Sequence, residues 1–79
     1  MNNEDKYKNV YIRVFSIENN EEIEKLEYQA IPEWDSVGHM SLIASLETDF
    51  DVELDVDDVI DLSSFNVGKE ILQKYGVTF

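Results

Sequence analysis

The chain has 79 residues, no cysteine and a formal net charge of −12, from 18 acidic and 6 basic residues. This length predicts one small domain spanning residues 1–79. The charge argues against nucleic acid and anionic membranes as partners, because both are polyanions. It either favours proteins with basic patches or merely keeps a small protein soluble. No apolar run is long enough for a membrane span, and the polar first residues do not resemble a signal peptide. We expect a soluble, monomeric, cytoplasmic protein with no membrane insertion.

The first regular element is a helix over residues 6–17. Its apolar residues recur at three- and four-residue spacing: Tyr7, Val10, Tyr11, Val14, Phe15 and Ile17. The β-branched and aromatic residues at 10–15 are also typical of a strand, but a strand would require strict alternation. Glu18, Asn19 and Asn20 are predicted to end the helix, since asparagines favour turns.

Residues 18–35 form a long acidic connection, in which a short helical turn is predicted at 21–27. Pro32 disfavours helix at the residue before it, so the chain is expected to be extended as it approaches Trp34. Trp34 could pin the loop to the core, shield the residues that follow it, or contact a partner. The pin is the favoured interpretation.

A second helix is predicted from about residue 36 to residue 50. Asp35 and Ser36 are both good helix N-caps, because their short side chains accept hydrogen bonds from first-turn amides. Val37, Met40, Ile43 or Ala44, and Leu46 or Phe50 then recur with helical spacing. Gly38 costs this helix about 1 kcal/mol relative to alanine. Either a partner enzyme or a group attached to the protein approaches closely there, or the glycine is a tolerated imperfection.

Residues 49–58 alternate between acidic and apolar types, which is the pattern of a strand and superficially that of a calcium loop. The EF-hand pattern fails, because Leu54 stands where glycine is required and Ile60 where glutamate is required. No metal site is therefore predicted. Ser63 and Ser64 offer a cap for a last helix, in which Val67, Ile71 and Tyr75 repeat every four residues before Gly76 ends it.

The stretch from Trp34-Asp35-Ser36-Val37-Gly38-His39-Met40 to Glu47, followed by residues 49–54, resembles the acyl carrier protein family. The resemblance is to stand-alone, phosphopantetheine-dependent carrier proteins of specialised pathways. It implies an all-α, small four-helix bundle of acyl-carrier-protein type, with a long loop after the first helix. It also implies a short third helix at about 56–61, with Val56, Val59 and Ile60 facing inward.

The same resemblance implies a carrier function centred on Ser36. A phosphopantetheinyl transferase, using coenzyme A and magnesium, would attach 4′-phosphopantetheine to this serine. The arm would hold an acyl, aminoacyl or related group as a thioester and present it to a loading ligase and downstream transferases with basic docking patches. The implied partner-binding residues are Asp35, Val37, Met40, Glu47 and Asp49. Gly38 and Ser41 stand where fatty-acid carriers commonly have acids, which points to a dedicated biosynthetic pathway.

No intrinsic enzyme activity is expected, because the single histidine and the serines form no convincing catalytic triad and a small bundle leaves little room for a cleft. His39 lies one turn beyond Ser36, where a protonated ring could donate to a phosphate. An exposed surface histidine with no role is the favoured interpretation. The competing function is a non-carrying, acidic protein-interaction module in which Ser36 is only a helix cap.

Overall fold

The computed structural model describes residues 2–18 and 21–79. In them it contains four α-helices and one 3-10 helix: α1 (Asn3–Phe15), η1 (Glu21–Lys25), α2 (Ser36–Phe50), α3 (Val56–Asp61) and α4 (Phe65–Lys74). Within these ranges there is no strand, and a single isolated β-bridge pairs Glu27 with Ser64. The prediction of a small all-α bundle, with a long connection after the first helix and a short third helix, is confirmed.

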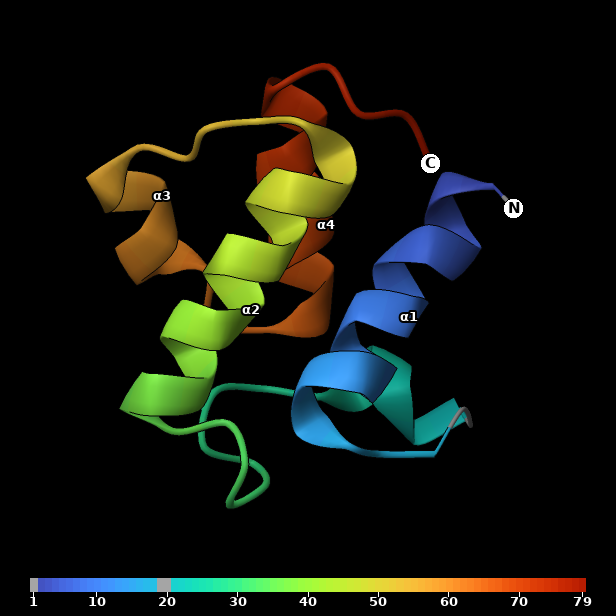
Figure 1. The fold of residues 1–79 in the computed structure, drawn as a ribbon, viewed down its shortest axis with the longest axis vertical. Helices are drawn as coiled ribbons and strands as arrows, with labels where there is room; N and C mark the ends of the chain where they lie inside the picture. The colour runs from blue at the N-terminus through green and yellow to red at the C-terminus, as the bar shows by residue number, and fades with distance from the viewer. Residues whose placement is uncertain (1, 19–20) are drawn as a thin grey trace.

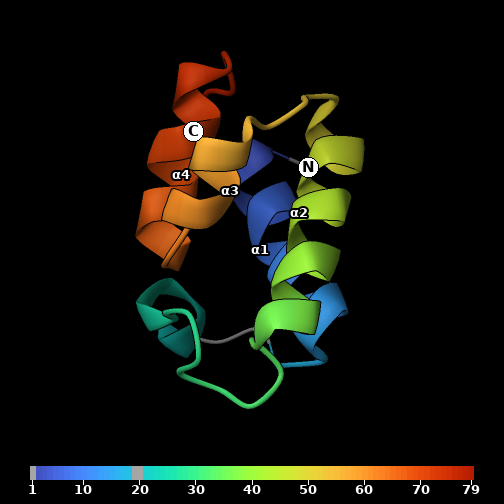
Figure 2. The ribbon, with the colours of Figure 1, turned by 90° about the vertical axis from the view of Figure 1, so that its left-hand side faces the viewer.

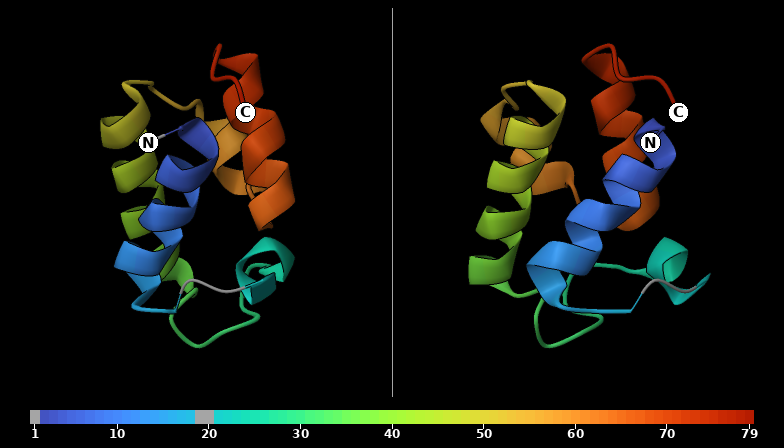
Figure 3. Two further views of the ribbon diagram at one scale, coloured as in Figure 1. Left: turned by 90° about the vertical axis from the view of Figure 1, so that its right-hand side faces the viewer. Right: turned by 45° about the vertical axis from the view of Figure 1, so that its right-hand side comes forward.

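The helices surround one core. Helix α1 packs along α2 (Figure 1), while α3 lies on the opposite side of the bundle, across α2 and α4 (Figures 2 and 3). The connection between α1 and α2 closes the end of the bundle where α2 begins. The chain termini meet at the other end, where the Asn3 side-chain amide donates to the Thr78 carbonyl over 2.9 Å.

Local capping sets the helix bounds. Helix α1 begins and ends earlier than predicted, because Asn2 caps it by accepting from the Asp5 amide and Ser16 turns into the left-handed region at φ 54°. Helix α2 has the predicted bounds, and α4 follows the predicted cap, Ser64, whose side chain accepts from the Val67 amide. Asn19 and Asn20, expected to form the first turn, lie outside the described residues.

Aromatic side chains fill the centre of the core. Their rings pack at centroid distances of 4.7 to 5.9 Å, and the cluster consists of Tyr7, Tyr11, Phe15, Trp34 and Phe65. Trp34 is 0% exposed, which confirms that it pins the connection to the core. Burial raises the pKa of both tyrosine hydroxyls well above the ordinary value of 10. They stay protonated and serve as hydrogen-bonding groups.

The two tyrosine hydroxyls form a directed chain. Tyr7 donates to the Phe65 carbonyl of α4 over 2.7 Å, and its oxygen lies 2.8 Å from the Tyr11 hydroxyl. Because each hydroxyl has one proton, Tyr11 must be the donor to Tyr7. The chain joins α1 to the first turn of α4 inside the core.

Two predictions about local structure are wrong. Val56 and Ile60 do not face inward, since they are 74% and 72% exposed, and it is Asp58 that is buried on α3. The reason is that Leu54 and Leu62 anchor the two ends of α3 in the core, and this sets the rotation of the short helix between them. The chain is also not extended before Trp34. The Trp34 amide donates to the Ile31 carbonyl over 3.1 Å and so closes a turn. Pro32 occupies the second position of this turn, where the fixed φ of proline is favourable.

Gly68 lets α1 and α4 approach closely. A Cβ at this position would overlap the Tyr7 hydroxyl and lie 3.2 Å from that of Tyr11. The Tyr7 hydroxyl has no room to yield, because it is buried and hydrogen-bonded on both sides. Packing therefore outweighs the intrinsic preference of a helix for alanine over glycine.

We expect Gly68→Ala to lower the free energy of unfolding by about 2 kcal/mol, despite a propensity gain of about 1 kcal/mol. Urea unfolding followed by circular dichroism measures this. Gln73→Ala, at an exposed position of the same helix, is the control and should be neutral or stabilising. Tyr7→Phe removes the overlapping oxygen, so the double variant should lose less than the sum of the single losses. Full additivity would show that the tyrosine is not the obstacle.

Candidate functional site

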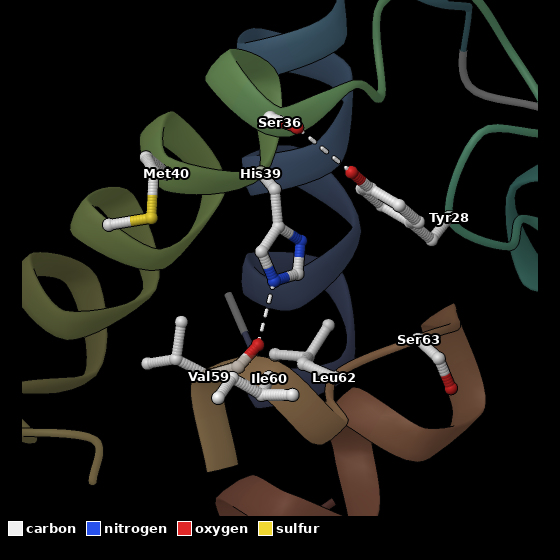
Figure 4. A pocket seen from close by; sticks show the side chains of 8 residues that line it. All are labelled: Tyr28, Ser36, His39, Met40, Val59, Ile60, Leu62 and Ser63. Carbon is white, nitrogen blue, oxygen red and sulfur yellow. Dashed lines mark hydrogen bonds between the residues drawn. The ribbon is translucent and has the colours of Figure 1, made fainter. Parts of the chain in front are cut away.

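The candidate site lies where the α1–α2 connection enters α2. Asp35 is the N-cap of this helix, since its carboxylate accepts from the Gly38 amide over 2.8 Å and its carbonyl from the His39 amide over 2.8 Å. Ser36 is thus the first residue of the helix rather than its cap. Its exposed hydroxyl instead shares a hydrogen bond of 3.2 Å with the hydroxyl of Tyr28 (Figure 4).

Gly38 is required by the path of the connection. A Cβ there would overlap the backbone carbonyl oxygen of Glu33 and lie 3.3 Å from the Phe15 ring. The close approach that a glycine permits is therefore made by the chain's own backbone, so neither a partner nor a tolerated imperfection is needed to explain it. This contact fixes the connection against the first turn of α2, directly before Ser36.

His39 links three parts of the fold. The Trp34 indole N–H donates to its Nδ1 over 3.0 Å, and its Nε2 lies 2.8 Å from the Val59 carbonyl of α3. Because an indole only donates and a carbonyl only accepts, the ring is the neutral tautomer with its proton on Nε2. The prediction of a surface histidine without a role is wrong. Both ring nitrogens are occupied, so His39 is not placed to donate to a group on Ser36.

A cavity of about 410 Å³ opens beside Ser36, between α2 and α3 (Figure 4). Eight residues line it: Tyr28, Ser36, His39, Met40, Val59, Ile60, Leu62 and Ser63. Most of its wall is apolar, and its polar side chains are those of Tyr28, Ser36, His39 and Ser63. Such a cavity suits an apolar or amphipathic chain that is held by a few hydrogen bonds.

The residues predicted to bind partners divide into two groups. Val37 and Met40 are 76% and 58% exposed and lie on the turns of α2 next to the cavity. The acidic members bond within the chain. Asp35 caps α2, Glu47 accepts from the Leu54 amide over 2.9 Å, and Asp49 pairs with Arg13 over 3.0 Å. Partner binding by these residues stays a prediction. Val37 and Met40 are the two whose side chains a partner could contact without breaking a hydrogen bond or ion pair of the chain.

Helix α3 is attached to α4 by polar contacts. The Asp58 carboxylate accepts from Lys74 over 2.6 Å and from the Tyr75 hydroxyl over 2.5 Å, and the Asp55 amide donates to that hydroxyl over 3.0 Å. The hydrogen bond from Lys74, followed by that from Tyr75, lowers the pKa of Asp58 below its ordinary value of 3.8. This network keeps the α3 wall of the cavity in place.

Sequence reasoning missed two residues of this region. Tyr28 carries no local sequence signal, and nothing in the sequence brings it to Ser36. Asp58 belongs to a run of acids that are nearly identical in local pattern. Only the positions of Lys74 and Tyr75 in the folded chain distinguish it from its neighbours.

Among residues 2–18 and 21–79, no group of three or more His, Cys, Asp or Glu side chains is arranged to hold a metal ion. Over the same residues, none of the helices combines the length and the apolar character that crossing a membrane requires. Comparisons with protein-family models, with curated proteins and with solved structures gave no match.

The lowered pKa of Asp58 gives its contacts a defined pH dependence. The unfolded chain takes up a proton at this carboxyl before the folded chain does, so the contribution to stability is complete above about pH 4 and is lost as the pH falls through the folded pKa. We expect Asp58→Asn to be less stable than wild type at pH 7, and the difference between the two proteins to be smaller at about pH 3.

Urea unfolding at both pH values measures this decrease. Asp57→Asn is the matched control, because Asp57 is an exposed carboxylate one residue away on the same helix. It should change stability little at either pH. A constant difference between Asp58→Asn and wild type at pH 7 and at about pH 3 would contradict the role assigned to the carboxylate charge.

Proposed function

We propose that this protein is a carrier of the acyl-carrier-protein type, with 4′-phosphopantetheine attached to Ser36. The arm would carry an acyl, aminoacyl or related group for the enzymes of a dedicated biosynthetic pathway. In the attachment step the Ser36 Oγ would form a bond to the β-phosphorus of coenzyme A, the pyrophosphate bond would break, and 3′,5′-ADP would leave. The serine proton would pass to a base of the transferase.

The observation that carries the proposal is the state of the Ser36 hydroxyl. It lies on the first residue of α2, is exposed, and takes no part in capping, because Asp35 performs that task. A serine kept only as a cap would occupy the position that Asp35 holds. The hydroxyl is thus open to modification at no cost to the helix.

The surroundings of Ser36 fit a phosphopantetheine arm. The cavity beside it combines apolar walls with hydroxyl groups, matching an arm that alternates methylene groups and amides. Tyr28 and Ser63 could hold polar atoms of the arm, and Met40 and Ile60 its apolar parts. When bound, the arm supplies a thiol that the cysteine-free chain lacks, and with it the capacity to hold cargo as a thioester.

The competing proposal is an acidic interaction module that carries no cargo. It draws support from four exposed apolar side chains on α2 and α3, namely Val37, Met40, Val56 and Ile60. The interaction module would explain Ser36 as a helix cap, but the cap of α2 is Asp35. The two functions differ in one measurable property, which is covalent modification.

We expect incubation with coenzyme A, magnesium and a broad-specificity phosphopantetheinyl transferase to add the mass of one phosphopantetheine. Ser36→Ala should abolish the addition, while circular dichroism shows the helical content of wild type. Ser41→Ala, an exposed serine of the same helix, should be modified like wild type. An unchanged mass of wild type with several transferases would support the interaction module instead.

We further expect modification to depend on the acidic surface of α3. Asp57 is exposed, and its carboxylate makes no hydrogen bond or ion pair in the described part of the chain, so Asp57→Lys changes charge without breaking a contact. It should lower kcat/KM for modification several-fold at low salt and much less at high salt, because salt screens the attraction. Glu70→Lys, which makes an equal charge change at an exposed position of α4, is the control. Equal effects of both variants would mean that only net charge matters.

A further inference from the structure

The strongest unexplained contact of the site is the one between Tyr28 and Ser36. Tyr28 belongs to the connection, eight residues before Ser36, and its hydroxyl lies 3.2 Å from the serine Oγ. Figure 4 shows the ring at the edge of the cavity with its hydroxyl pointing toward the serine. No other side chain is hydrogen-bonded to Ser36 among the described residues.

The position of Tyr28 is fixed from several sides. Its amide donates to the Ser63 carbonyl over 2.8 Å, and the next amide, of Gln29, donates to the Trp34 carbonyl over 2.9 Å. Its ring stands edge-on to those of His39 and Trp34, at centroid distances of 5.5 and 6.4 Å. The hydroxyl is therefore held beside Ser36 by the fold, although the residue is 37% exposed.

A phosphate on Ser36 would find few other partners. The chain has no lysine or arginine between Lys25 and Lys69, and none lines the cavity. The ring nitrogens of His39 are occupied by Trp34 and the Val59 carbonyl. Of the side chains around Ser36, the Tyr28 hydroxyl is the one that already lies within hydrogen-bond distance of the serine Oγ.

Modification would also give this contact a direction. In the free hydroxyl pair either oxygen can donate. Once Oγ is part of a phosphoester it has no proton, so Tyr28 becomes the donor and the anionic phosphate the acceptor. A hydrogen bond to a charged acceptor is stronger than one between neutral groups.

We propose that Tyr28 is a positioning residue that holds the phosphate of an arm on Ser36 and directs the arm toward the cavity between α2 and α3. This rests on the proposed carrier function and adds a residue outside the Asp35-Ser36-Val37 stretch. Tyr28→Phe keeps the ring packing and removes only the hydroxyl. Tyr75→Phe is the control, because it removes a hydroxyl that contacts α3 but not Ser36.

The test compares the unmodified and modified forms of wild type and both variants. Thermal melts give the change in melting temperature on modification, and phosphorus NMR reports the phosphodiester directly, with the urea-unfolded modified protein as the reference for a free phosphate. Modification should stabilise wild type and Tyr75→Phe by a similar amount, and Tyr28→Phe by less. The Tyr28→Phe resonance should narrow and move toward the unfolded reference. A general loss of stability would lower the melting temperatures of the unmodified and the modified form of a variant equally.

The outcomes separate the two proposals. If wild type and Tyr28→Phe are both modified, but their resonances and their stabilisation on modification are the same, the role of Tyr28 is wrong and the carrier function stands. If wild type takes no phosphopantetheine, the carrier function and the role of Tyr28 are both overturned. If Tyr75→Phe shows the same loss as Tyr28→Phe, the effect comes from loosening α3 and the direct contact is refuted.

Discussion

The arrangement of the site depends on one partly buried chain of two hydrogen bonds, from the Trp34 indole to His39 and from His39 to the Val59 carbonyl. It connects the α1–α2 connection, helix α2 and helix α3 through a single imidazole ring. The indole can only donate and the carbonyl can only accept, so the tautomer of the imidazole between them is determined. Without this chain, α3 would keep its flanking leucines and its polar contacts to Lys74 and Tyr75 but lose this link to α2, and the cavity would lose its defined wall.

Ser36 is accessible because the residues around it carry the structural tasks. Asp35 caps the helix, Gly38 receives the backbone of the connection, and His39 joins α2 to α3. Among positions 35 to 39, Ser36 and Val37 are exposed and perform none of these three tasks, and the hydroxyl of Ser36 contacts Tyr28. A site for covalent modification has to be exposed on a rigid support, and this division of tasks provides both.

Much of the fold could be predicted because it depends on local patterns. The bounds of α2 follow from a cap and an apolar repeat, and the burial of Trp34 from its place in a long connection. The prediction failed where neighbours distant in sequence decide. The rotation of α3 is set by the burial of Leu54 and Leu62, and it turns Asp58 instead of Val56 toward Lys74 and Tyr75, which lie far along the chain. The role of His39 could not be predicted, because its partner Val59 lies twenty residues away in another helix.

The isolated bridge between Glu27 and Ser64 has a consequence for the order in which the protein can form. Backbone hydrogen bonds on either side of it, from Tyr28 to Ser63 and from Phe65 to Leu26, join segments separated by almost half of the chain. Contacts of such separation form late in folding, since a long loop must close first. During synthesis, Tyr28 is therefore fixed beside Ser36 only after the start of α4 has been made.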